Sequence, residues 1–192
     1  MNPDWRSRPR CDKYYTRAEL RAMLELARAS DDLHHLFLLT VYVFGLRVSE
    51  ALALRAGDVS SESVAIRTSK RGQAVRVPLF SYPEDPLFNV SYWLQGHARR
   101  LHPVTQLFPW GRQHAHALVC HYATLAGVPR ERQGVHALRH SAARHAKDAG
   151  CGIATVQQLL RHKSIASTGA YFKESMAEAM AKVHAGLRQA VV

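Results

Sequence analysis

The sequence predicts a mainly α-helical protein with a small antiparallel β-sheet, an α+β fold. Apolar residues recur at helical spacing in most segments of the chain. One stretch, 63–78, instead alternates apolar and polar residues around a polar turn, which is typical of a β-hairpin. The 192 residues are the size of one domain, and a hydrophobic fraction of 47% is enough for a packed core. We therefore expect one helical domain that carries a single hairpin.

The first predicted helix follows a basic segment. Residues 1–14 are polar and basic without apolar periodicity, so we expect a flexible arm ahead of a domain that spans residues 15–175. Thr16 and Glu19 have the spacing of a capping box, in which each side chain bonds the backbone N–H of the other residue. The apolar residues that follow share one helix face, namely Leu20, Met23, Leu24 and Ala27.

A second and more buried helix is expected between Asp31 and Gly45. Asp31 and Asp32 are typical caps at its start, and the residues between are largely apolar. Glycine can adopt the backbone conformation that ends a helix, so Gly45 is the expected stop. A short helix is expected to follow over residues 49–54.

Residues 63–68 and 73–78 are the two expected strands of the hairpin. Their alternation places Val64 and Ile66 on the same face as Val75 and Val77. The sequence Lys70-Arg71-Gly72 lies between them as a polar turn.

The rest of the chain is expected to be helical. An alanine-rich C-terminal helix is part of this pattern, and its apolar residues could pack on the chain's own core. The expected helices cover residues 90–101, 113–126, 136–149, 155–160, 165–172 and 174–191.

Composition limits the classes of function. Lys and Arg number 26 against 15 Asp and Glu, a net charge of +11, which favours a polyanionic partner such as nucleic acid or an acidic membrane. The longest apolar run, 36–46, is too short to span a bilayer, and the N-terminus lacks the apolar segment of a secretory signal. Three widely spaced cysteines without a CxxC pair predict neither a disulfide framework nor a zinc site. We expect a soluble protein of a reducing cytoplasm, with no metal and no cofactor.

Four separated segments carry residues suited to phosphate chemistry. They are Gly45-Leu46-Arg47-Val48-Ser49-Glu50, the turn with Lys70, His136-Ala137-Leu138-Arg139-His140, and Leu159-Leu160-Arg161-His162 followed nine residues later by Tyr171. In this order they resemble the tyrosine recombinase, or phage integrase, family, over most of the chain from about Thr16 to Phe172. Each segment alone is weak, whereas the ordered set is specific.

The resemblance implies a role for each of six residues and a fold like the catalytic domain of these enzymes. Arg47 and Arg139 would clamp the scissile phosphate, Lys70 would protonate the leaving 5′ oxygen, and His136 would act in proton transfer. His162 would hydrogen-bond the phosphate, and Tyr171 would attack phosphorus to give a 3′-phosphotyrosine link.

The residue types fit this chemistry independently of the resemblance. Two guanidinium groups can neutralise the charge on the non-bridging oxygens with forked hydrogen bonds. A tyrosine hydroxyl has a pKa of about 10, so it needs a base or a cationic field to attack at neutral pH. His136 and Arg139 lie three residues apart and therefore share one helix face.

Each residue also has an ordinary structural interpretation. Arg47 could pair with Glu50, the pair His136 and Arg139 could form a solvated helix face, and Tyr171 could be a core aromatic. Lys70 could be a solvated turn lysine, and His162 a helix-end histidine. The joint presence of all six favours the recombinase interpretation.

Four more cations in or near these segments are expected to contact DNA, namely Arg71, Arg144, Arg161 and Lys163. Arg71 is also an alternative to Lys70 in the hairpin role. Arg161 departs from the family, which often has glycine before the second histidine. The short region before the match resembles single-domain members such as the fimbrial phase-variation recombinases, and a fragment of a longer integrase is the alternative.

The resemblance implies a prokaryotic, nucleoid-associated enzyme that recombines double-stranded DNA at paired repeat sites through a Holliday junction. It implies a monomer that assembles into a homotetramer on DNA, with accessory DNA-bending proteins as further candidate partners and no membrane partner. The C-terminal helix, residues 176–192, would then dock on a neighbouring protomer. Two alternatives stay open at this point: a DNA-relaxing enzyme like a type IB topoisomerase, and a DNA-binding regulator with a decayed active site.

Overall fold

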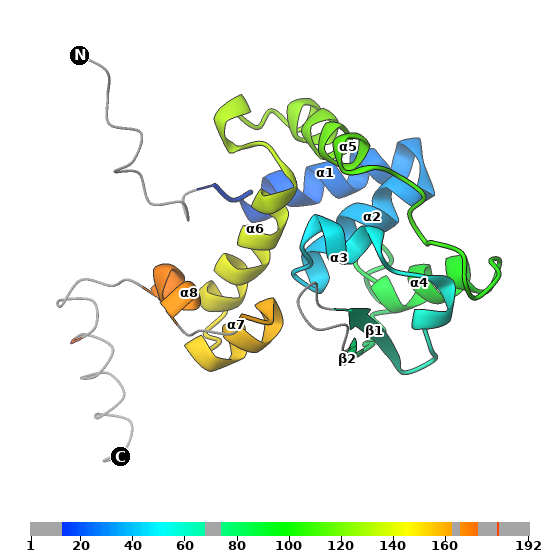
Figure 1. The fold of residues 1–192 in the computed structure, drawn as a ribbon. Coiled ribbons are helices and arrows are strands. Elements are labelled where there is room, and N and C mark those ends of the chain that lie inside the picture. The colour runs from blue at the N-terminus through cyan, green and yellow to red at the C-terminus, as the bar shows by residue number, and fades with distance from the viewer. Residues whose placement is uncertain (1–12, 68–73, 163–165, 173–179, 181–192) are drawn as a thin grey trace.

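The structure is a computed structural model that describes residues 13–67, 74–162 and 166–172 together with Met180. The described part is mostly helical, with one two-stranded sheet (Figure 1). Its helices are α1 (Arg17–Ser30), α2 (Asp32–Val43), α3 (Val48–Leu52), α4 (Val90–Ala98), α5 (Arg112–Leu125), α6 (Val135–Asp148), α7 (Ile153–Leu160) and α8 (Ala166–Gly169). Short 3-10 helices are η2 (Ala56–Asp58), η3 (Arg130–Arg132) and η4 (Ala170–Phe172). The strands are β1 (Ser63–Arg67) and β2 (Ala74–Pro78). The predicted fold class is confirmed.

The helix starts follow the capping signals in the sequence. Thr16 accepts a hydrogen bond from the backbone N–H of Glu19, and the Glu19 carboxylate accepts one from Thr16, so the capping box is confirmed. Asp31 accepts from the N–H groups of Leu33 and His34 at the start of α2. Each cap satisfies N–H groups that have no partner inside the helix.

Gly45 ends α2 and also allows a close approach of another helix. Its φ of +53° is a conformation that side chains disfavour, and a Cβ at this position would lie 3.1 Å from Cδ2 of Leu160. The residue is therefore constrained twice, by its backbone and by its neighbour. The consequence is that the segment carrying Arg47 lies against the end of α7.

The hairpin has the predicted register. Val64 faces Val77 and Ile66 faces Val75 across the antiparallel pair, so the four side chains share one face as expected. Val64 and Ile66 are fully buried, whereas Val75 is 44% exposed. The inner strand β1 therefore anchors the sheet to the core, and β2 is the outer strand.

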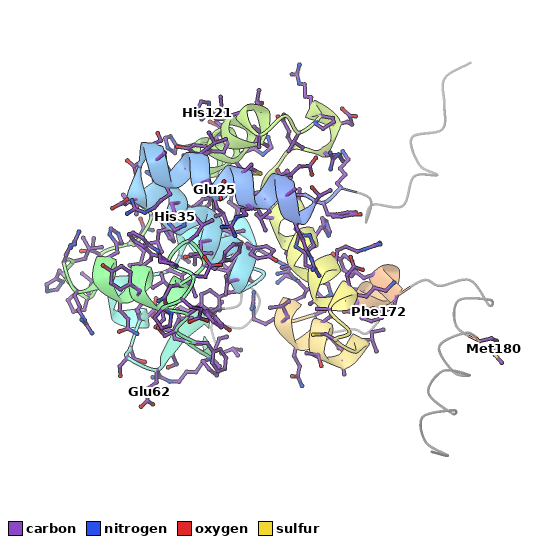
Figure 2. All side chains as sticks on the ribbon, turned by 180° about the vertical axis from the view of Figure 1, so that it is seen from behind. Glu25, His35, Glu62, His121, Phe172 and Met180 are labelled. Atoms are coloured by element: carbon purple, nitrogen blue, oxygen red, sulfur yellow. The ribbon has the colours of Figure 1, made fainter. Side chains whose placement is uncertain are left out.

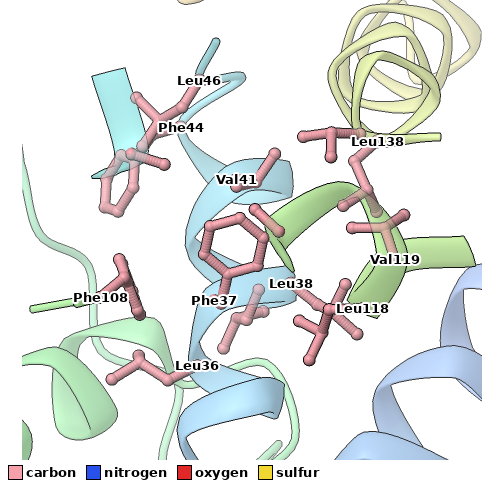
Figure 3. Close-up of a cluster of buried hydrophobic side chains, with 14 of the residues drawn as sticks. Leu36, Phe37, Leu38, Val41, Phe44, Leu46, Phe108, Leu118, Val119 and Leu138 are labelled. Carbon is pink, nitrogen blue, oxygen red and sulfur yellow. The ribbon is translucent and has the colours of Figure 1, made fainter. Parts of the chain in front are cut away.

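The main core surrounds α2, which contacts α1, α3, α4 and α6. Phe37, Leu38 and Val41 of α2 pack against side chains of the surrounding elements, including Phe108, Val119 and Leu138 (Figure 3). Because its neighbours cover it on several sides, α2 is apolar around much of its circumference.

A smaller apolar cluster lies at the α7–α8 end of the molecule. It contains Ala143 of α6, Val156 and Leu160 of α7, and Tyr171 of η4, with Phe172 packed beside them. In the view from behind, Phe172 lies at this end, whereas Glu62 lies beside the hairpin at the other (Figure 2). This cluster holds the C-terminal described segment against α6 and α7.

Some boundaries differ from the prediction. The helix expected over residues 165–172 is two short elements, α8 and η4, and the 3-10 helices η2 and η3 were not expected. The turn around Lys70 and Arg71, the arm before Lys13, and the C-terminal helix apart from Met180 lie outside the described residues. No helix in the described ranges combines the length and the apolar character that a membrane crossing requires.

Candidate active site

The candidate site is organised around the carboxylate of Glu50, which is fully buried. One oxygen accepts a 2.8 Å hydrogen bond from the Arg47 guanidinium, and the other accepts one of 2.9 Å from the Arg47 backbone N–H. Arg161 donates to the second oxygen at 3.0 Å, and Arg139 lies 3.9 Å from it. Burial raises the pKa of Glu50, but the Arg47 backbone N–H and the charge of Arg161 outweigh it, so the pKa is lowered.

Arg139 joins three segments of the chain. Its guanidinium donates to the carbonyl oxygens of Gly45 and Leu160, the latter at 2.6 Å, and the residue is 4% exposed. Burial, and then the charge of Arg47, lower its pKa to about 10, so it stays protonated at neutral pH. Arg139 therefore fixes α6 against both the loop before α3 and the end of α7.

Arg161 is placed inward, which differs from the expectation that it contacts DNA. Its side chain is 7% exposed and donates to the carbonyl oxygens of Phe44 and Gly45 and to the Glu50 carboxylate. Its backbone is left-handed, with φ 51° and ψ 41°. Glycine adopts this conformation most easily, which explains physically why a glycine suits this position.

Changing Arg161 to glycine and to alanine should separate the contribution of its guanidinium contacts from the cost of its left-handed backbone. Both variants lose the guanidinium contacts and should be less stable than the wild type. The glycine variant should be more stable than the alanine variant by about 1 kcal/mol, because only alanine carries the cost of a left-handed backbone. Urea unfolding measures the difference. The same pair of changes at Gln158, an exposed position within α7, should give the opposite order, because glycine weakens a helix interior by about 1 kcal/mol.

Three histidines lie close to the arginines. Burial comes first among the causes that lower their pKa values, and the charges of Arg139 and other nearby groups add to it. The pKa of His140 and that of His162 both fall to about 4, and the pKa of His136 is lowered. Nδ1 of His162 is 3.0 Å from the hydroxyl of Thr168. At neutral pH, His140 and His162 are therefore neutral hydrogen-bonding groups.

Tyr171 has the ring of a core residue and a polar contact at its hydroxyl. The residue is 8% exposed, and its ring packs in the small apolar cluster of α6 and α7. Its hydroxyl is hydrogen-bonded to Nδ1 of His140, and the two ring centroids are 5.7 Å apart. Ionisation of the Tyr171 hydroxyl would raise the pKa of Arg139, so the hydroxyl belongs to the same electrostatic environment as the arginine cluster.

A pocket of about 340 Å³ opens beside His136 and His140. Arg112 and His116 of α5 contribute to its wall, as does Arg132. Among the described residues that line it, none is acidic. Arg47 does not line this pocket, but it keeps 37% of its side chain exposed, so an anion in solution can reach its guanidinium.

The structure thus brings together five of the six residues assigned by sequence: Arg47, His136, Arg139, His162 and Tyr171. Lys70, Arg71 and Lys163 lie outside the described residues. Arg144 lies elsewhere on α6, because five helical residues turn it about 140° from Arg139. It donates to Asp148 at 3.1 Å and lies over the ring of Tyr14.

Two contributors to the site were not assigned a role by sequence. His140 follows Arg139 directly, and its spacing of four residues from His136 is the signal that could have found it, since such residues are neighbours on a helix. Glu50 was noted only as a partner for Arg47, whereas it also receives Arg161 and lies near Arg139. That convergence depends on segments about 90 to 110 residues apart.

Known proteins resemble both the sequence and the fold. The model of the phage integrase family matches residues 13–178. The chain is 32% identical over 145 residues to the tyrosine recombinase XerD of Yersinia pestis, covering 68% of this chain and 46% of that protein. It is 31% identical over 171 residues to XerD of Xanthomonas axonopodis pv. citri, covering 79% and 49%. The chain spans about half the length of these curated relatives.

Solved structures show the same fold. The XerH site-specific recombinase bound to its difH substrate superposes with a TM-score of 0.72 and 22% identity, covering 89% of this chain and 53% of that chain. The XerA recombinase gives a TM-score of 0.71 and 20% identity, covering 91% and 65%. The fold with its small antiparallel sheet, and the family match across residues 13–178, lead to one conclusion: the chain belongs to the phage integrase family of tyrosine recombinases.

Proposed function

We propose that this chain is the catalytic part of a site-specific recombinase that cuts and rejoins double-stranded DNA through a 3′-phosphotyrosine intermediate. The observation that carries the proposal is the cluster of Arg47, Arg139, His136 and His162 near the Tyr171 hydroxyl. Positive groups gather at one place, and a hydroxyl nucleophile lies beside them. Such an arrangement fits transfer of a phosphodiester to tyrosine.

The proposed reaction begins with the scissile phosphate beside Arg47 and Arg139. Their charges offset the negative charge that develops on the non-bridging oxygens as the Tyr171 oxygen attacks phosphorus. His162, neutral at neutral pH, can donate a hydrogen bond to the phosphate, and Thr168 holds its ring. The leaving 5′ oxygen takes a proton from a general acid, for which Lys70 is the proposed residue. Rejoining reverses these steps with a new 5′ hydroxyl.

The proposed partner is duplex DNA with paired repeat sites. The net charge of +11 supports an electrostatic attraction to DNA, and the XerH recombinase is known in complex with its difH substrate. We further propose that four protomers assemble on two duplexes, that accessory DNA-bending proteins assist, and that the enzyme acts at the nucleoid. The segment 176–192 is proposed to contact a neighbouring protomer, and Lys163, Arg71 and Arg144 to contact DNA.

A library of nicked duplexes with a randomised centre tests the proposed function. A nick beside the cleavage position releases the short 5′-hydroxyl strand, so an attacked phosphate stays attached to the protein. We expect adducts that survive detergent, and sequencing of their DNA gives the target site. A plasmid carrying two copies of that site should then yield recombinant circles. Relaxation of supercoils without recombinant product, or the absence of any adduct, would contradict the proposal.

Changing Lys70 to alanine should slow cleavage severely and leave DNA affinity nearly unchanged. The expected loss is about 100-fold or more, because a positioned general acid commonly contributes that much. A substrate with sulfur in the bridging 5′ position has a better leaving group and should restore cleavage by the variant. The matched control is Arg71 to alanine. If sulfur rescues the Arg71 variant and not the Lys70 variant, the general acid is Arg71.

A further inference from the structure

The hydrogen bond between His140 and Tyr171 joins two firmly placed elements. His140 lies in the interior of α6, and Tyr171 lies in η4, which packs against the same helix. Nδ1 of His140 contacts the Tyr171 hydroxyl, and the two rings are tilted by 45°. Contacts with Ala143 and Val156 hold the tyrosine ring from its apolar side. The direction of the hydroxyl is therefore set by packing on one side and by the imidazole on the other.

The imidazole is in the form that accepts a proton. Burial, together with the neighbouring charges of His136 and Arg139, lowers the pKa of His140 to about 4, so the ring is neutral at neutral pH. A neutral imidazole with its proton on Nε2 presents a lone pair at Nδ1, which is the atom that contacts the phenol. The Tyr171 hydroxyl can then donate its hydrogen bond to His140.

Binding of DNA makes His140 a stronger base. The phosphate brings a negative charge next to Arg47 and Arg139, which offsets the cationic surroundings that disfavour an imidazolium. His140 is thus a stronger base with a phosphate bound than without one. Proton transfer from the tyrosine is therefore more favourable when there is a phosphate to attack.

We propose that His140 orients the Tyr171 hydroxyl and accepts its proton during attack, a role that rests on the proposed recombinase function. The O–H bond of Tyr171 breaks, and the proton passes to Nδ1 of His140. The freed electron pair forms the bond from the tyrosine oxygen to phosphorus, the bond from phosphorus to the 5′ oxygen breaks, and the general acid protonates that oxygen. On rejoining, His140 returns the proton. The resemblance to the family gives proton transfer to His136, whereas this contact assigns the nucleophile's proton to His140.

Variants at position 140 and a matched histidine test the proposal. His140→Ala should reduce the rate of adduct formation on the nicked duplex by about 100-fold or more while DNA affinity changes less than about twofold. His140→Asn keeps a polar group near the position of Nδ1 but cannot take up the proton, so it should stay at least about tenfold below the wild type. His145→Ala is the control, because Nδ1 of His145 contacts the Tyr42 hydroxyl at 2.9 Å on the same helix. Its adduct rate should stay near the wild-type rate.

A more acidic phenol separates proton acceptance from a structural role. A fluorinated tyrosine placed at position 171 loses its proton more easily, so it should restore much of the rate lost in His140→Ala. Circular dichroism and the DNA affinity of each variant report whether the fold survives, and His140→Asn serves if His140→Ala does not fold. Wild-type or faster adduct formation in His140→Ala, or no rescue by the acidic phenol, would overturn the role of His140 alone. The absence of adduct from the wild type with the whole library would overturn the proposed function itself.

Discussion

Replacing Tyr171 with phenylalanine is expected to abolish covalent attachment to DNA and to leave the fold intact. The change removes one oxygen and keeps the ring volume, so the contacts with Ala143, Val156 and Leu160 persist. The lost hydrogen bond to His140 should cost about 1 kcal/mol of unfolding free energy. Without the hydroxyl no phosphotyrosine can form. Adduct on the nicked duplex should fall below detection, while the DNA affinity measured by gel shift stays near the wild-type value.

Tyr122→Phe is the matched control for this prediction. Tyr122 is 1% exposed, and its hydroxyl contacts Nδ1 of His34 at 2.8 Å, so the substitution also removes a buried contact between tyrosine and histidine. The control should form adduct at close to the wild-type rate. Protease digestion and mass spectrometry should find the nucleotide on the peptide that contains Tyr171. A nucleotide on another tyrosine, or an adduct in the Tyr171 variant, would refute the assignment.

Sequence spacing predicted much of the site because helical geometry is local. His136 and Arg139 share a helix face. Arg47 could be placed because it follows Gly45, the glycine that ends α2, by two residues. The hairpin register followed from alternation, because one buried face fixes which residues pair. These features need information from only a few neighbouring residues.

The direction of Arg161 could not be predicted in this way. An arginine beside a histidine in a phosphate-binding motif suggests a charge aimed at DNA. Its guanidinium instead turns inward, because Glu50 and the carbonyl oxygens of Phe44 and Gly45 offer buried acceptors more than a hundred residues away in sequence. The contact of His140 with Tyr171 was missed for the same reason, since Tyr171 is 31 residues away on another element. Long-range packing decides both contacts.

Glu50 should be the residue whose charge matters most to the stability of the site. Glu50→Gln keeps the size of the side chain and removes its negative charge. Arg139 and Arg161, with side chains 5% and 7% exposed, would then lie close together without the carboxylate. Removing one partner of a buried ion pair typically costs about 3–5 kcal/mol. We expect a loss of that size in urea unfolding at neutral pH, together with reduced adduct formation, because the Arg47 guanidinium would lose its charged hydrogen-bond partner.

The pH dependence of this loss identifies the carboxylate as its cause. The pKa of Glu50 in the folded protein lies below its ordinary value of 4.5, so the carboxylate stabilises the fold above that value. This contribution disappears as pH falls through the lower folded pKa. The stability difference between wild type and Glu50→Gln should therefore be largest at neutral pH and shrink below about pH 4.5. The buried histidines also take up protons on unfolding in acid, but both proteins contain them, so the difference isolates Glu50.

Asp58→Asn provides the contrast that makes the prediction specific. Asp58 is also buried, accepts from the backbone N–H of Arg55 at 2.9 Å, and pairs with Arg67 at 2.7 Å. Arg67, however, keeps 47% of its side chain exposed, so water can solvate its charge when the carboxylate is lost. The expected cost is about 1–2 kcal/mol, close to that of one hydrogen-bonded cap. Asp58 pairs with one exposed arginine, whereas Glu50 contacts a cluster of arginines that are mostly buried. Equal losses of unfolding free energy in the two variants would show that the cluster does not depend on Glu50.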